Sequence, residues 1–121
     1  MSNMNTIKIP KHYMFMLNQL FEMEQKVAKI QEQNSVQRNI DRLKGFFETE
    51  ALSDNQGLVF YNPLGENFDE TRTDCEATIS GTGHEKLKII EVIRPIIYVK
   101  YGNTQMIAQK AIVIVQSENQ N

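Results

Sequence analysis

The spacing of apolar residues along the chain changes once, near residue 53. Before this point, five apolar residues recur at alternating steps of four and three, the spacing by which one helix packs against another: Met16, Leu20, Met23, Val27 and Ile30. After it, apolar residues form short runs bounded by turn residues, as in β-strands. The pattern predicts an α+β fold, in which a helical dimerisation segment over residues 1–52 precedes a small, mostly antiparallel β domain over residues 53–121.

The helical series loses its register in the polar stretch that contains Asn34 and Gln37. A second series begins there, out of phase with the first: Val36, Ile40, Leu43 and Phe47. Either one helix continues through a stutter, or the first helix ends near Asn34-Ser35 and a second one begins. We favour a break, because Ser35 is a suitable N-cap residue.

Two interpretations of the first series are open. The apolar stripe can lie on the chain's own sheet, since periods of 3.6 and 3.5 residues differ little over so few turns. It can instead pack against a second copy of the chain, which would help to stabilise a small β domain. We favour the homodimer, with the first series as its interface, because Met14, Phe15 and Phe21 widen the apolar face as a four-helix bundle requires.

The second half of the chain contains five runs that predict strands: Leu58–Tyr61, Cys75–Ile79, Leu87–Ile93, Ile96–Tyr101 and Met106–Val115. Pro95 cannot donate to a central ladder, so we expect a bend, a bulge or an edge position there. Gly102 and Asn103 stand between two runs and predict a two-residue hairpin turn. The stretch 112–115 is apolar at every position, which predicts a strand that is central or covered.

Composition excludes several classes of protein. The net charge of −2 and the absence of a basic stripe argue against nucleic acid as the main partner. The single cysteine cannot form an internal disulfide, which indicates a reducing compartment. The first residues lack the apolar core of a signal peptide, and no apolar run approaches the roughly 18 residues of a membrane span. We therefore expect a soluble, cytoplasmic protein without a membrane partner.

Candidate catalytic chemistry is sparse. Cys75 lies in a predicted strand, and pairing with His84 across a hairpin would be needed to activate it, whereas a lone buried cysteine is usually an apolar filler. An acidic group lacks the alternating ligands and turn glycine of a calcium loop, and we interpret it as a solvated rim: Glu66, Asp69, Glu70, Asp74 and Glu76. No zinc-type spacing of cysteine and histidine exists. The sequence predicts no catalytic residue, no metal site and no cofactor, and thus a protein that is not an enzyme.

The segment Asn62-Pro63-Leu64-Gly65-Glu66-Asn67-Phe68-Asp69, followed by Glu76-Ala77, resembles the GrpE family. In that family a turn with proline and glycine, a Phe-Asp pair and then Glu-Ala open the β domain. Glu91-Val92-Ile93 and Ala111-Ile112-Val113-Ile114-Val115 are similar to later strands of the family, and the order of a helical part before a β domain also agrees. The sequence departs from the family in its final hairpin, where Gln105-Met106 and Gln109-Lys110-Ala111 replace the arginine-containing elements.

This resemblance implies a homodimeric co-chaperone that promotes ADP release from a DnaK-type chaperone by binding its nucleotide-binding domain. Among the contact positions that the family implies, Val115 is retained, and the altered hairpin suggests four further contacts: Lys100, Tyr101, Asn103 and Gln105. The alternative is an adaptor without exchange activity that keeps the dimer and uses its β domain to bind another protein.

Overall fold

The computed structural model describes residues 9–30, 35–52 and 55–118. Two helices precede the strands: α1 (Lys11–Ala28) and α2 (Val36–Thr49). The strands that follow are β1 (Gln56–Tyr61), β2 (Asn67–Phe68), β3 (Cys75–Ser80), β4 (Leu87–Arg94), β5 (Ile96–Tyr101), β6 (Thr104–Gln109) and β7 (Ala111–Ser117). The predicted α+β order is confirmed.

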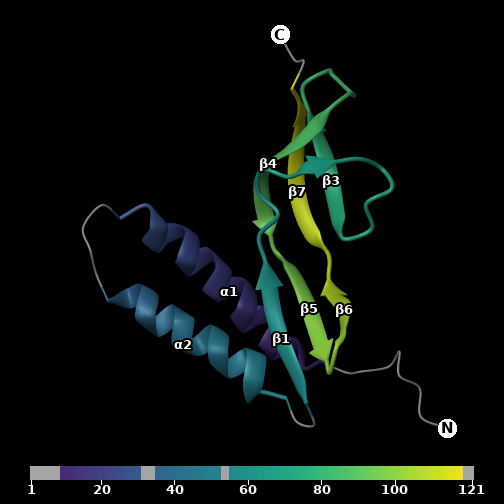
Figure 1. Ribbon diagram of the computed structural model, residues 1–121. Coiled ribbons are helices and arrows are strands. Elements are labelled where there is room, and N and C mark those ends of the chain that lie inside the picture. The colour runs from purple at the N-terminus through teal and green to yellow at the C-terminus, as the bar shows by residue number, and fades with distance from the viewer. Residues whose placement is uncertain (1–8, 31–34, 53–54, 119–121) are drawn as a thin grey trace, which may run out of the picture.

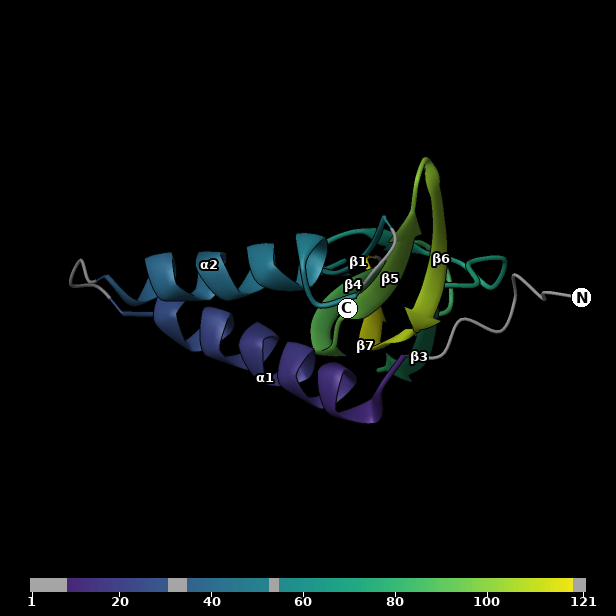
Figure 2. The same cartoon turned by 90° about the horizontal axis from the view of Figure 1, so that it is seen from below.

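The two helices lie side by side and project from one flank of the strands (Figures 1 and 2). The predicted break is confirmed, because α1 ends at Ala28 and α2 begins at Val36. Ser35 occupies the N-cap position of α2, but its side chain makes no capping hydrogen bond. Asn34 lies outside the described residues.

The strands form two small sheets. Sheet A has the order β1-β5-β6 and is antiparallel throughout, whereas sheet B has the order β2-β4-β7-β3. In sheet B only the pairing of β3 with β7 is parallel. The prediction of a mostly antiparallel arrangement is therefore confirmed, and β7 is central in its sheet, as its apolar sequence indicated.

One long, bent hairpin connects the two sheets (Figure 1). Its first arm runs through β4 and β5 and its second through β6 and β7, with interruptions at Pro95 and Lys110. The ladder passes from the pair Arg94 and Ile112 in sheet B to the pair Ile97 and Gln109 in sheet A. The predicted single strand Met106–Val115 was therefore wrong, because the ladder is interrupted opposite Pro95, which has no N–H to donate.

The predicted turn closes this hairpin. Tyr101 pairs with Thr104, which leaves two residues in the loop. Gly102 has a φ of 58°, a conformation that a glycine adopts without the steric cost that a β-carbon would add. Asn103 is not among the residues with positive φ, so glycine alone supplies the unusual backbone angle.

Two apolar clusters form the core. The first joins both helices to sheet A: Leu17, Leu20, Ile40, Phe47, Leu58, Ile97 and Val99. The second lies within the curve of sheet B: Cys75, Leu87, Ile89, Ile96, Ala111, Val113 and Val115. The neighbours Ile96 and Ile97 belong to different clusters, because successive side chains of a strand point to opposite faces. The helices and the β domain thus share a core across the predicted boundary at residues 52 and 53.

Candidate interaction surfaces

The tip of the β5–β6 hairpin gathers four of the five predicted partner-binding residues. Tyr101, Asn103 and Gln105 are exposed there, and Lys100 is half-buried. The Lys100 ammonium lies 3.1 Å from the Glu48 carboxylate, which ties the hairpin to the last turn of α2. The tip is thus an exposed polar and aromatic surface that is held at its base.

Val115 lies elsewhere. It has no exposed surface, and it contributes to the second core cluster from the central strand of sheet B. A side chain without exposed surface cannot touch a partner in this fold, so the assignment of Val115 as a contact is corrected to a core position.

The five residues of the predicted dimer interface divide between two environments. Leu20 is buried and Val27 partly buried against the first core cluster, so the interpretation that the stripe lies on the chain's own fold holds for these two. Met16, Met23 and Ile30 are exposed. Together with α2, the first part of this stripe borders a shallow apolar groove of about 190 Å³, lined by Phe15, Met16, Gln19, Leu20, Met23, Leu43 and Phe47. This exposed surface of α1 and α2 is named here the helix face.

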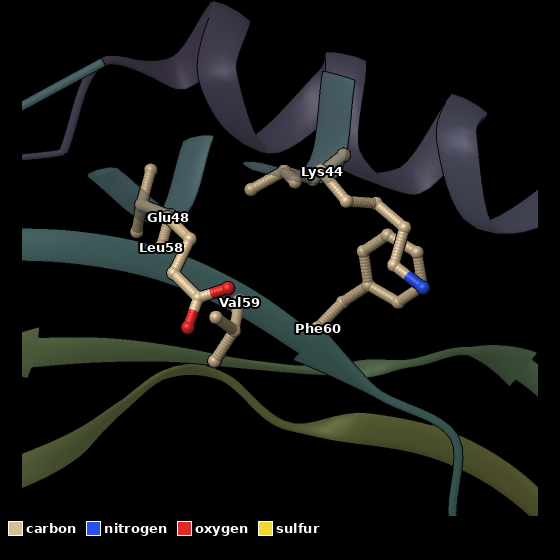
Figure 3. A pocket seen from close by; sticks show the side chains of 6 residues that line it. Lys44, Glu48, Leu58, Val59 and Phe60 are labelled. Carbon is tan, nitrogen blue, oxygen red and sulfur yellow. The ribbon is translucent and has the colours of Figure 1, made fainter. Parts of the chain in front are cut away.

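A second recess, also of about 190 Å³, lies between α2 and β1 (Figure 3). Its charged side chains are already engaged: the Lys44 ammonium stands 5.0 Å from the centre of the Phe60 ring and 3.1 Å from the Glu24 carboxylate. Glu48 is the partner of Lys100. These contacts hold α2 against the edge of sheet A, and they leave no reactive group directed at a ligand among the residues of Figure 3.

The segment that carries the resemblance to the GrpE family folds into a tight turn on β4. The Leu64 N–H donates to the Asn62 side chain at 3.1 Å, and Gly65 has a φ of 86°. The Gly65 N–H donates to the Ile89 carbonyl, and the Ile89 N–H donates to the Glu66 carbonyl, each at 2.9 Å. The turn is therefore an integral part of sheet B, and its positive φ favours glycine at position 65.

Arg72 pairs with two members of the acidic group that was predicted to be a solvated rim. Its guanidinium lies 2.7 Å from both Glu66 and Asp74, and it also donates to the Asn67 carbonyl at 2.9 Å. The hydrogen bond from Arg72 is the main cause that lowers the pKa of Asp74. Sequence reasoning missed this cluster, although a lone arginine among five acids was a visible signal.

Cys75 has the chemistry of a core residue. Burial, followed by the charge of Asp74, raises the pKa of its thiol to about 11. At neutral pH the sulfur is protonated, whereas a nucleophile needs the thiolate.

Within residues 9–30, 35–52 and 55–118, no group of three or more potential ligands is arranged to hold a metal ion. Neither α1 nor α2 is long and apolar enough to cross a membrane.

Comparison with known proteins identifies no relative: no family model, no curated protein and no solved structure matches this chain. The function of its surfaces must therefore be inferred from their own geometry and chemistry.

Proposed function

We propose that this protein is a dimeric, GrpE-like exchange factor that promotes ADP release from a DnaK-type chaperone. The observation that carries the proposal is the presence of two separate exposed surfaces on one folded core. The helix face is apolar and suits a second copy, and the hairpin tip is polar and aromatic and suits a different partner. Such a protein needs no catalytic residue, because preferential binding to an open state of the chaperone shifts its population towards that state.

The proposed dimer joins two helical hairpins into a four-helix bundle. Phe15, Met16, Met23 and Leu43 are exposed large apolar residues that border the groove of the helix face. Covering half-exposed side chains of this size contributes roughly 1 kcal/mol each, so eight of them from two copies contribute about 8 kcal/mol, which is comparable with the cost of association. A groove between two helices is also the shape that receives the ridge of a neighbouring helix.

A charge on the helix face tests the dimer. Leu43→Asp should shift the protein to a monomer in analytical ultracentrifugation, because the carboxylate would be buried without a partner. Ile90→Asp is the matched control, since Ile90 on β4 is 45% exposed and Leu43 is 46% exposed. Leu20→Asp is not suitable here, because Leu20 is buried in the chain's own core and its replacement would unfold the monomer. An unchanged mass for Leu43→Asp would contradict the proposed interface.

Exchange activity is tested by release of a fluorescent ADP analogue from DnaK-type chaperones. The wild-type protein should accelerate release, and Tyr101→Ala should reduce the acceleration at least tenfold if the hairpin tip is the contact. Tyr61→Ala serves as control, because Tyr61 is an exposed tyrosine at the other end of sheet A. No acceleration with any chaperone from the same organism would overturn the proposal.

The adaptor without exchange activity is the competing function. It predicts a stable complex with a protein other than a chaperone, unaffected by the nucleotide present. Isothermal titration of the purified partner with ADP, with ATP and without nucleotide distinguishes the two functions, because only an exchange factor must bind the nucleotide-free chaperone more tightly.

A further inference from the structure

Sheet B is curled, so that its two edges approach each other. Its strand order places β2 and β3 at opposite ends, yet Phe68 of β2 and Cys75 of β3 pack in the same apolar cluster. Both residues also line one groove of about 510 Å³, together with Asp69, Glu70 and Arg72 of the loop that leads into β3. Figure 1 shows this loop swinging out beside β3. The groove thus lies where one more strand would close the sheet.

The free edge of β3 borders this groove with open peptide groups. The Ala111 N–H of β7 donates to the Asp74 carbonyl at 2.9 Å, so the peptide groups of every second residue from Asp74 face β7. The peptide groups of Cys75, Ala77 and Ile79 consequently face the other side, where the described residues provide no strand. An unpaired edge of this kind is a template for an added strand.

The side chains of the same three residues make the groove wall apolar. Cys75, Ala77 and Ile79 all line it, and Leu87 joins them from β4. Natural edge strands are commonly protected by lysine, proline or a bulge, and these three positions contain neither lysine nor proline. Ile79 is 39% exposed, which leaves an apolar surface for an incoming side chain.

The surroundings of the groove are acidic. Arg72 does not contribute a free positive charge, because Glu66 and Asp74 pair with it. The other charged residues of the segment from β2 to the start of β4 are exposed. Asp69, Glu70 and Lys86 line the groove, and Glu76 and Glu85 lie outside its lining, so acids outnumber bases four to one among them. An occupant with positive charge is favoured, and a second copy of this edge is disfavoured because two acidic rims would meet.

We infer that this groove binds an extended, basic and apolar peptide segment of a partner protein, which adds a strand to β3. Apolar side chains of the segment would lie on Ala77 and Ile79, and the alternate lysine or arginine side chains would lie on the other face, beside Glu76. This surface differs from both the helix face and the hairpin tip, so the inference does not depend on exchange activity.

A labelled octapeptide of alternating lysine and valine tests the inference by fluorescence polarisation with the full chain. The peptide should bind, and its counterpart with glutamate in place of lysine should bind at least tenfold more weakly. Two further peptides carry N-methyl groups either at all lysines or at all valines. One of these patterns should weaken binding at least tenfold and the other much less, because only one edge of the peptide pairs with β3. Absence of binding, or equal binding of both methylated peptides and the parent, would overturn the inference.

Ile79 on β3 and Ile107 on β6, each on an edge strand of its sheet, supply a matched pair of variants. Ile79→Lys on β3 should weaken peptide binding at least tenfold, whereas Ile107→Lys on β6 should change it less than twofold. Ile107 is 41% exposed and receives the same added charge, so the pair separates docking on β3 from general electrostatic attraction. An equal loss in both variants would contradict the site.

Amide chemical shifts of the wild-type protein provide a readout that does not depend on any variant folding. Added peptide should shift the amides of Cys75, Ala77 and Ile79 more than those of Gln105 and Ile107. Shifts confined to β6 would overturn the inference. Shifts at β3 that depend on protein concentration without peptide would assign the edge to a second copy and would also overturn it.

Discussion

The two ends of the bent hairpin differ in how their apolar side is covered. In sheet A the helices provide the cover, and the shared cluster includes residues from α1, α2, β1 and β5. In sheet B the curl of the sheet and the loop that contains Arg72 provide it, with a groove left along β3. The hairpin therefore carries a helix-covered sheet at one end, and at the other end a sheet whose edge strand β3 is open. The difference lies in what packs beside the strands.

The largest effects are expected from substitutions in the two core clusters, and they test whether both clusters unfold in one transition. Ile40→Ala in the first cluster and Ile89→Ala in the second each remove a fully buried side chain and should lower the free energy of unfolding by about 3–4 kcal/mol. Both variants should show one transition in denaturant at a fixed protein concentration, since Ile96 and Ile97 connect the clusters within β5. Two separate transitions in the Ile89→Ala variant would show that sheet B unfolds independently.

The contact between α2 and β1 should be the next most sensitive. A β-carbon at Gly57 would lie 2.0 Å from the Glu48 backbone carbonyl oxygen, so Gly57→Ala must displace the helix and should lower the unfolding free energy by about 2–3 kcal/mol. Gly45→Ala adds the same methyl group within α2, where nothing lies within 4 Å, and should stabilise by about 0.5–1 kcal/mol. Denaturant titration of both variants measures the difference, and equal effects would refute the close approach.

Loss of Arg72 should weaken the cover of sheet B by a smaller amount. Arg72→Met should lower the unfolding free energy by about 1–2 kcal/mol at neutral pH, because two ion pairs and a backbone hydrogen bond are lost. The pKa of Asp74 is lowered in the folded state, so its stabilising effect is present above the unfolded pKa of about 3.9 and is lost as the pH falls through the folded pKa.

The decrease of stability at low pH provides a second test of the role of Arg72. Wild-type stability should therefore decrease below about pH 4, and the Arg72→Met variant should show less of this decrease. Thermal melts between neutral pH and pH 2 will measure it. A decrease of equal size in both proteins would indicate that Asp74 does not depend on Arg72.

The smallest effect is expected at the contact between α1 and the bend of the long hairpin. Asn18 and Gln109 exchange two hydrogen bonds, at 3.1 and 2.9 Å, and Gln109 also donates to the Pro95 carbonyl at 3.0 Å. Asn18→Ala should lower the unfolding free energy by about 1 kcal/mol and speed amide exchange at Gln109, while the groove along β3 still binds the peptide. A weakened peptide affinity would show that α1 controls the groove through the bend.

Most elements could be predicted from the sequence, because their signals are local. The helix spacing, the break before Val36 and the turn at Gly102 each depend on residues a few positions apart. The two-residue strand β2 had no such signal, and the split at Lys110 depends on Pro95, which lies opposite it in the bend rather than beside it in the chain. The candidate surfaces followed the same rule: the hairpin tip was predicted from a local turn, whereas the groove along β3 joins residues from two edges of a sheet.

By itself, the sequence determined that a helical part precedes a β domain and that a tight hairpin closes two of its strands, since period and turn chemistry act over short distances. Only the tertiary structure decided which residues of the helical stripe are buried, that Val115 is core, and that Arg72 joins Glu66 to Asp74. It also decided that β3 pairs with β7 in parallel and so leaves an edge open. These outcomes depend on contacts between distant segments, whose stability comes from packing that no local pattern encodes.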